Sequence, residues 1–254
     1  MSDSTTIANG ALPQAAEGHA AHPPYQRHHF QSVTQQFDAT NFAMWLFLLT
    51  EVMFFGGLFT AYLIMRNWYY PAFVEGSHHL SIFWGTTNTA VLITSSFTVA
   101  MGVWCAQTRR KNGLVLFLVL TFILGLVFLC IKGIEWHQEW VDYHVPGLRF
   151  SEADFLNPKL DPAIYSEYHD KPLTGGMASK TEEYFFLYFA MTGMHAVHMV
   201  VGIGILVFLI ITAMRGTYTD GHYTYVENFG LYWHFVDIIW IFLYPLLYLI
   251  SRHT

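Results

Sequence analysis

A single glutamate stands in the middle of an apolar stretch near the start of the chain. Glu51 lies in LLTEVMFFGG, and residues 41–65 carry no other charged side chain. A charged carboxylate at the centre of a membrane helix costs about 2.5–3.5 kcal/mol on insertion scales. The cost falls if the group is protonated or finds a partner on a neighbouring helix. Such an acid either holds a helix bundle together or lies beside a route for protons or ligands, and both interpretations stay open for Glu51.

Paired histidines occur in a later apolar stretch, FAMTGMHAVHMVVG. His195 and His198 are three residues apart and share a helical face with Gly202. Two histidines in a membrane invite a metal or haem interpretation, in which His234 of the last apolar stretch supplies a second axial ligand. Metal sites need further ligands and supporting hydrogen bonds, and Glu-x-x-His pairs typical of di-iron bundles do not occur within the apolar stretches. Hydrogen bonding between helices or to lipid headgroups is therefore the preferred interpretation.

The last apolar stretch, VENFGLYWHFVDIIWIFLYPLLYL, is the richest in polar residues. Glu227 and His234 are seven residues apart and share a face, and Asp237 follows His234 by about one turn. Trp233 and Trp240 flank Asp237 at i−4 and i+3, and tryptophan N–H and histidine N–H groups are both donors able to satisfy a buried aspartate. No activated serine or cysteine accompanies these residues, which argues against a hydrolytic triad. The sequence assigns no catalytic residue and no metal ligand.

The elements that must position these residues are membrane-spanning helices. Of the 254 residues, 54% are hydrophobic and only 12% are charged, about half the charged share of a soluble domain. Five long apolar runs without period-2 alternation predict transmembrane helices. They cover residues 41–65, 82–105, 113–134, 184–213 and 230–251. The sequence thus predicts an all-α integral membrane protein with five transmembrane helices in one bundle.

Charge and composition outside the apolar runs predict the topology. Residues 1–40 are polar and read as a disordered cytoplasmic tail that precedes a membrane domain at residues 41–251. The basic triplet at residues 109–111 joins the second and third runs, and the positive-inside rule places it in the cytoplasm, with the C-terminus outside. A long acidic external loop is predicted at about residues 135–183. An acidic loop can steer a basic partner, although plain solvation is the simpler interpretation. The net charge of −6, without a basic patch, argues against nucleic acid.

Five motifs taken in order converge on one family. The chain resembles subunit III of the haem–copper respiratory oxidases, which include cytochrome c oxidase and its quinol-oxidase relatives. The resemblance covers nearly all of residues 41–251. It is carried by TEVMFFGGLFTAY, NTAVLITSSFT, KGIEW, FAMTGMHAVHMVVG and VENFGLYWHFVDIIWIFLYPLLY. Longer members have two further N-terminal helices; because residues 1–40 are polar, the chain resembles the five-helix bacterial version.

The resemblance implies a non-catalytic subunit of a bacterial terminal oxidase, located in the inner membrane. The complex of such a subunit serves aerobic electron transport, reducing oxygen to water and pumping protons. Haem and copper are expected in the catalytic subunit I and none in this chain, and subunits I and II are the implied partners. The resemblance implies that the subunit binds phospholipid in a cleft that can serve oxygen approach, and that the subunit itself helps to sustain proton uptake by the complex. The acidic external loop is a possible contact for other respiratory complexes.

The resemblance also carries over to individual residues. Glu51 matches the family's intramembrane acid, which is known for its modification by a carbodiimide reagent, and is expected to be functional. The other matching residues are expected to make contacts to lipid or between helices; they are Glu135, His195, His198, Glu227, Trp233, His234 and Asp237.

Two rival functions stay open at this point. One is an accessory subunit of a nitric oxide reductase within the same family, and the other is a b-haem membrane electron carrier that uses His195, His198 and His234. The sequence does not decide whether cytochrome c or a quinol donates the electrons.

Overall fold

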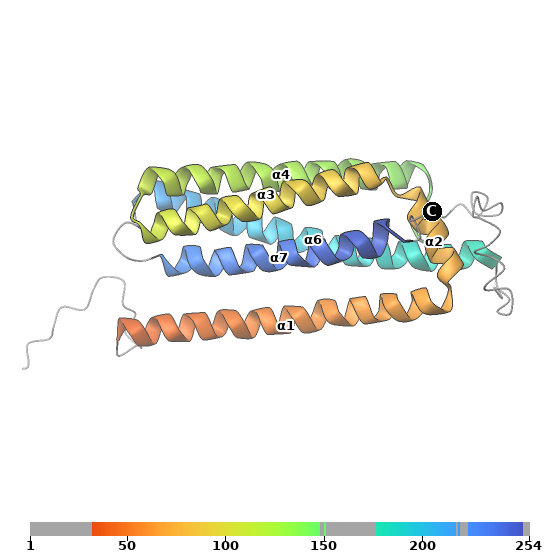
Figure 1. The fold of residues 1–254 in the computed structure, drawn as a ribbon, viewed down its shortest axis with the longest axis horizontal. Helices are drawn as coiled ribbons and strands as arrows, with labels where there is room; N and C mark the ends of the chain where they lie inside the picture. Colours follow the sequence, from red (N-terminus) through yellow and green to blue (C-terminus); the bar gives the residue numbers. More distant parts are fainter. Residues whose placement is uncertain (1–31, 148–149, 151–175, 217, 219–222, 251–254) are drawn as a thin grey trace, which may run out of the picture. The chain divides into compact units, whose positions relative to one another are not determined.

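The computed structural model describes residues 32–147, 150, 176–216, 218 and 223–250. The regular structure of these residues is entirely helical (Figure 1). The helices are α1 (Val33–Trp68), α2 (Tyr70–His79), α3 (Ile82–Gln107), α4 (Lys111–Val141), α6 (Gly176–Met214) and α7 (Thr224–Tyr248). All of them except α2 are long and apolar enough to cross a membrane, which confirms the predicted five-helix membrane protein.

Four of the long helices form a ring. α3 packs against α4 and α7, and α6 packs against the same two helices on the other side (Figure 1). Small and hydroxylated side chains line the contacts. Thr98 of α3, for example, lies 2.8 Å from Thr121 of α4, hydroxyl to hydroxyl. Such residues let helices approach closely and hydrogen-bond where lipid offers no polar partner.

Helix α1 joins the others through a few large side chains. The chain divides into two units, one ending at Phe42 and one starting at Ala43, and the contacts of α1 with other helices lie in the second unit. Phe55 and Tyr62 of α1 are buried, and the Tyr62 hydroxyl donates to the carbonyl oxygen of Leu246 in α7. Most other side chains between Ala43 and Trp68 are exposed, as expected for a helix that faces lipid.

The short helix α2 was not predicted from the sequence. Pro71 stands in its first turn, where a missing N–H costs nothing, and Ala72, Phe73 and Val74 are fully buried. The helix packs on α6, where Gly76 lies against the ring of Tyr184. Its sequence, YPAFVEGSHH, has no long apolar run, so its burial follows from tertiary packing rather than from hydropathy.

Several helices extend beyond the apolar runs that predicted them. α1 begins at Val33, α4 continues to Val141 and α6 begins at Gly176. Residues 33–40, predicted as part of the tail, and residues 135–141 and 176–183, predicted as part of the external loop, are therefore helical. Backbone hydrogen bonds continue a helix past the hydrocarbon core, and hydropathy does not register that extension. Residues 1–31 and 151–175 of the predicted tail and loop lie outside the described residues.

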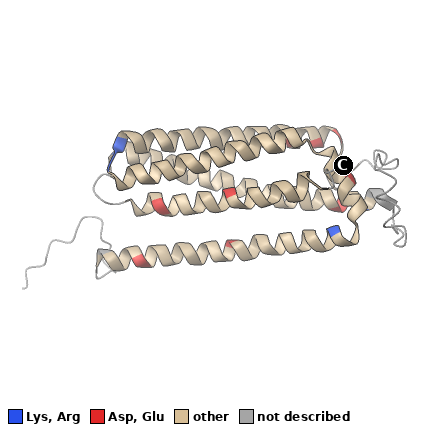
Figure 2. Cartoon of the chain, in the orientation of Figure 1, with Lys and Arg blue, Asp and Glu red and all other residues tan. Residues whose placement is uncertain are grey.

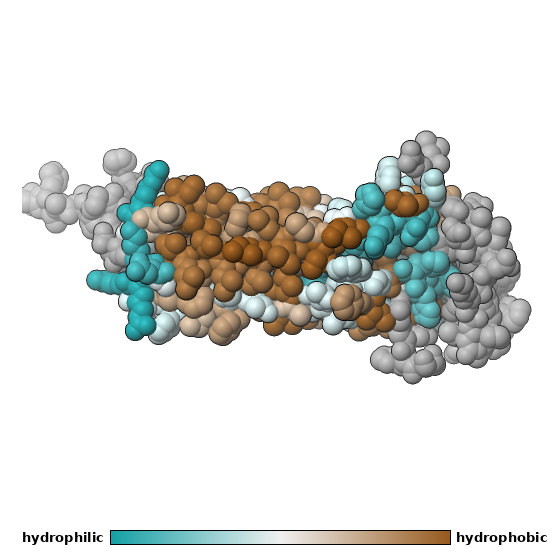
Figure 3. Space-filling model, turned by 90° about the horizontal axis from the view of Figure 1, so that it is seen from above, coloured by the Kyte–Doolittle hydropathy of each residue, from teal (hydrophilic) through white to brown (hydrophobic). Residues whose placement is uncertain are grey.

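The tight turn between α3 and α4 carries the basic triplet. Arg109 adopts φ 56°, and the N–H groups of Arg109 and Arg110 donate to the carbonyls of Ala106 and Cys105 at 3.1 and 2.8 Å. This pattern is a Schellman motif, which satisfies the last carbonyls of a helix. Charged residues gather toward helix ends, with few acids part-way along (Figure 2). The face in Figure 3 has a hydrophobic middle between hydrophilic ends, as a membrane span requires.

Candidate functional site

Glu51 of α1 has a partner on α6. Its Oε2 atom lies 3.0 Å from Nε2 of His198. The side chains are 19% and 15% exposed, respectively, so the pair is largely withdrawn from the surface. Phe55 lies one turn beyond Glu51 and packs its ring on the imidazole at 5.3 Å between centroids. The i, i+4 spacing of Glu51 and Phe55 puts both side chains on the face of α1 that meets α6.

The contact made by the other ring nitrogen of His198 determines where the hydrogen atoms of the Glu51–His198 pair lie. His198 Nδ1 lies 2.9 Å from the carbonyl oxygen of Met194. A carbonyl oxygen only accepts, so Nδ1 carries a hydrogen, and Nε2 of a neutral ring must accept. Glu51 is then a protonated acid that donates to Nε2; the other arrangement is a carboxylate facing an imidazolium.

Both arrangements place one proton between Glu51 Oε2 and His198 Nε2 and leave the pair without net charge. Removing two charges from water costs more than removing a neutral acid and a neutral ring. The chemistry that the site offers is a single proton that can sit on either of two facing atoms.

A hollow of about 440 Å³ lies beside this pair. Side chains of α1, α6 and α7 line it, and they are mostly apolar or aromatic, such as Phe47 and Val201. Tyr232 belongs to the wall as well, with its hydroxyl donating to the carbonyl oxygen of His198 at 2.8 Å. A hollow of this lining suits an acyl chain or another apolar molecule, with a hydrogen-bonding pair at its wall.

His195 lies in a different environment from His198 and has no part in the pair formed by Glu51 and His198. It is 1% exposed and packs between the rings of Phe128 in α4 and Trp240 in α7, at 5.4 and 5.0 Å between centroids. Neither of its ring nitrogens has a hydrogen-bond partner among the described residues. An α-helix turns about 100° per residue, so side chains three residues apart point in directions that differ by about 60°. This difference is enough to direct His195 and His198 toward different neighbouring helices. His234 contacts α3, so the three histidines of the haem interpretation lie in three different surroundings.

Trp233 fills the centre of the four-helix ring. Its side chain is fully buried, and its indole Nε1 donates to Ser95 Oγ of α3 at 3.0 Å. Gly125 of α4 and Gly202 of α6 lie against the indole, where a Cβ atom at either position would come within 3.0 Å of it. Gly202, predicted to share the face of the histidines, thus makes room for an aromatic side chain of α7.

The two tryptophans that flank Asp237 donate to other residues. Trp233 donates to Ser95, and Trp240 Nε1 donates to Thr89 Oγ1 at 3.1 Å, so neither indole reaches the carboxyl group. Both tryptophans point into the ring of helices, whereas Asp237 lies at the edge shared by α3 and α7. Spacing along a helix does not settle which of several donors an acid meets, because side-chain torsions and neighbouring helices decide it.

The remaining predicted residues contact neighbouring helices. Glu227 Oε1 accepts from Gln107 Nε2 of α3 at 2.7 Å. Glu135 is 2% exposed and lies 2.9 Å from Lys132 Nζ in the same helix, while Tyr248 of α7 donates to its other oxygen at 2.5 Å. These contacts agree with the expected inter-helix role of both acids.

The sequence did not reveal that Lys132 is the centre of a buried polar cluster formed with Glu135, Tyr188 and Tyr248. Lys132 is 2% exposed, and its Nζ donates to the hydroxyls of Tyr188 and Tyr248 at 3.0 and 2.7 Å as well as to Glu135. The rings of Tyr188, Tyr248 and Trp240 lie within 5.4 Å of the ammonium group, close enough for cation–π attraction. The signal available in the sequence was the i, i+3 spacing of Lys132 and Glu135 in KGIEW.

Removing the Glu51 carboxyl without replacement should destabilise the protein. In Glu51→Leu, His198 Nε2 loses its hydrogen-bond partner, which should cost about 1–3 kcal/mol of unfolding free energy. Glu51→Gln is the matched control, because its amide N–H can still donate to Nε2 and should leave stability and assembly nearly intact. Thermal unfolding in detergent measures both. Equal losses in the two variants would show that the carboxyl acts through something other than this hydrogen bond.

The fold and its buried polar pairs define a multi-pass, all-α membrane protein. A family model described as "Cytochrome c oxidase subunit III" matches residues 163–252. Among the similar proteins is cytochrome c oxidase subunit 3 of Thermostichus vulcanus, 31% identical over 208 residues, which are 82% of this chain and 85% of that protein. Those of Synechocystis sp. and Corynebacterium diphtheriae are each 28% identical, covering 94% and 81% of this chain and 81% and 85% of the relatives. The chain belongs to the cytochrome c oxidase subunit III family.

Proposed function

We propose that the chain is the non-catalytic subunit III of a bacterial terminal respiratory oxidase. The observation that carries the proposal is the match to a cytochrome c oxidase subunit 3 over 85% of that relative's length. The proposed partners are the catalytic subunit I, with the haem and copper of the complex, and subunit II. The chain stabilises the catalytic subunit while the complex reduces oxygen to water and pumps protons.

The hollow beside Glu51 is the proposed place for phospholipid acyl chains and for an apolar approach of oxygen. Its mostly apolar wall supports this assignment. The proton shared by Glu51 and His198 supports a role in sustaining proton uptake by the neighbouring subunit, since it can move between two atoms without creating net charge.

The proposed location is the bacterial inner membrane, with the α3–α4 turn on the cytoplasmic side. Arg109, Arg110 and Lys111 form that turn, and Arg215 follows the end of α6 on the same side of the ring. This clustering supports a cytoplasmic N-terminus and an external C-terminus by the positive-inside rule. The external side then holds Glu182 and Glu183 and the acidic residues between α4 and α6, a proposed contact for other respiratory complexes.

Purification of the intact complex through a tag on this chain tests the proposal. Mass spectrometry should find a haem–copper catalytic subunit in stoichiometric amount, and the absorption spectrum of the complex should show its haem. The chain released from that complex should show no stoichiometric Soret band. A nitric oxide reductase catalytic subunit in the complex, or haem that stays with the released chain, would contradict the proposal.

A further inference from the structure

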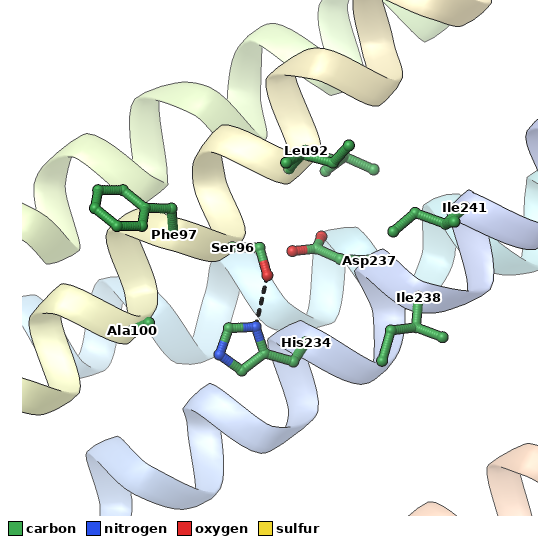
Figure 4. A pocket seen from close by; sticks show the side chains of 9 residues that line it. Leu92, Ser96, Phe97, Ala100, His234, Asp237, Ile238 and Ile241 are labelled. Atoms are coloured by element: carbon green, nitrogen blue, oxygen red, sulfur yellow. Dashed lines mark hydrogen bonds between the residues drawn. The ribbon is translucent and has the colours of Figure 1, made fainter.

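A second hollow, of about 460 Å³, opens between α3 and α7. Its polar residues are Ser96, His234 and Asp237, whose side chains point toward one another between the two helices (Figure 4). Ser96 Oγ lies 2.6 Å from His234 Nδ1, and the residues that the structure describes offer no hydrogen bond to the second ring nitrogen of His234. Apolar side chains form the rim, among them Phe97, which is 63% exposed.

Among the described residues, only the Ser96 hydroxyl is near enough to interact with the Asp237 carboxyl group, so most of the hydrogen-bonding capacity of this acid is not met there. The residue is 2% exposed, and neither carboxyl oxygen has a donor at hydrogen-bonding geometry in residues 32–147, 176–216 and 223–250. Ser96 lies beside the carboxyl, but its single hydroxyl also faces His234 and could serve at most one of the two oxygens. Other acids within these helices are paired, Glu51 with His198 and Glu135 with Lys132. A buried carboxyl without partners is costly, so a partner from outside the chain is expected.

The depth of the site determines what kind of molecule can supply that partner. Ser96 and Asp237 lie eleven or more residues from either end of their helices, which is about 16 Å of helix. The hydrocarbon core is about 30 Å thick, so both residues stand near its centre, beyond the reach of lipid headgroups. Acyl chains do reach this depth but carry no hydrogen-bond donor. A polar side chain on a neighbouring transmembrane helix can present a donor at this depth.

The surface of α3 suits a close helix contact at this place. Ser96 and Ala100 both line the hollow and form a small-xxx-small pair, which lets another helix backbone approach. Ile238 and Ile241 of α7, 49% and 44% exposed, provide the apolar ridge beside it. Helix–helix interfaces within membranes typically combine small residues, which allow close approach, with polar side chains and an apolar surround. The hollow between α3 and α7 has all three features.

We infer that the hollow between α3 and α7, called the groove from here on, binds a transmembrane helix of a neighbouring subunit. This helix presents a hydrogen-bond-donating side chain to Asp237 and His234 at mid-membrane depth. The inference rests on the proposed function, because it requires assembly with other membrane subunits. It adds the face of this chain that makes the contact and the chemistry that the contact uses. The occupant is a protein helix; a bound lipid is the alternative that the experiment must separate.

Photo-crosslinking within the intact complex tests the inference. A benzophenone amino acid replaces Ile238 at the groove or, as the control, Ile123 of α4, which is also 49% exposed. Irradiation in the native membrane, followed by purification and mass spectrometry, should join position 238 to a transmembrane segment of a co-purifying subunit at least tenfold more efficiently than position 123. Phospholipid adducts alone at position 238, with other subunits still co-purifying, would overturn the inference and leave the proposed function standing. The absence of any co-purifying subunit would overturn both.

Variants of Asp237 separate docking from internal packing. Asp237→Leu should reduce the amount of co-purified neighbouring subunit per chain by about tenfold while the amount of the chain in the membrane stays unchanged. Asp237→Asn, whose amide oxygen still accepts, should retain most of the co-purification. Loss of the chain itself in Asp237→Leu, with the subunit ratio unchanged in what remains, would show that the acid serves this bundle and would overturn the inference.

Discussion

Replacing Lys132 by methionine is expected to lower the unfolding free energy of the bundle by about 3–5 kcal/mol. Lys132 is 2% exposed and bridges Glu135 of its own helix to Tyr188 of α6 and Tyr248 of α7. Methionine fills a similar volume but leaves the Glu135 carboxylate buried without its cation. Thermal or denaturant unfolding of the detergent-solubilised chain measures the loss.

A double variant identifies the cause of that loss. In Lys132→Met with Glu135→Leu both charges are absent, so most of the stability should return, as it does when a buried ion pair is replaced by apolar side chains. The Tyr248 hydroxyl loses an acceptor in this variant, which keeps the recovery incomplete. A double variant as unstable as the single one would assign the loss to packing around the lysine rather than to the unpaired acid.

Gly76→Ala is expected to detach α2 from α6. An added Cβ atom would lie 2.3 Å from Tyr184 Cδ1, far inside contact distance. The tyrosine ring has little room to yield, because it is fully buried and its hydroxyl donates to the carbonyl oxygen of Leu247 at 2.8 Å. The expected loss is about 1–3 kcal/mol, the usual range for overpacking, together with faster proteolysis within residues 70–79.

Gly133→Ala is the matched control for Gly76→Ala. A Cβ atom at position 133 meets nothing within 4 Å, so the substitution should change stability by less than about 1 kcal/mol. Equal effects of the two substitutions, or unchanged proteolysis within α2 in Gly76→Ala, would contradict the close packing of Gly76 on Tyr184.

The long apolar runs made most of the fold predictable, because hydropathy depends only on local sequence. The five spans follow from it, and helix α2 does not. The packing partners of single polar residues were less accessible. Glu51 and His198 are 147 residues apart, and nothing in either stretch points to the other. Recognising each as an unusual residue was possible from the sequence; pairing them required the arrangement of α1 beside α6.

The polar residues of α7 mark the limit of helical spacing as a guide. Spacing predicted correctly that Glu227 and His234 lie on one face, since both contact α3. It failed for Asp237, because the two flanking indoles meet hydroxyls of α3 that the sequence of α7 does not contain. Lys132 was missed for another reason: the three aromatic rings that enclose it belong to α6 and α7, and the sequence of its own apolar run does not contain them.

The sparse attachment of α1 bears on the order of events during biosynthesis. Helix α1 leaves the ribosome before α6 and α7, and two of its hydrogen-bond partners follow much later: His198 comes 147 residues after Glu51, and Leu246 comes 184 residues after Tyr62. Until then α1 has its ring contact with Phe73 of α2 but lacks these two hydrogen bonds, and its apolar surface allows it to stay in the bilayer without them. The hydrogen bonds that tie α1 to α6 and α7 form only after those two helices have been inserted.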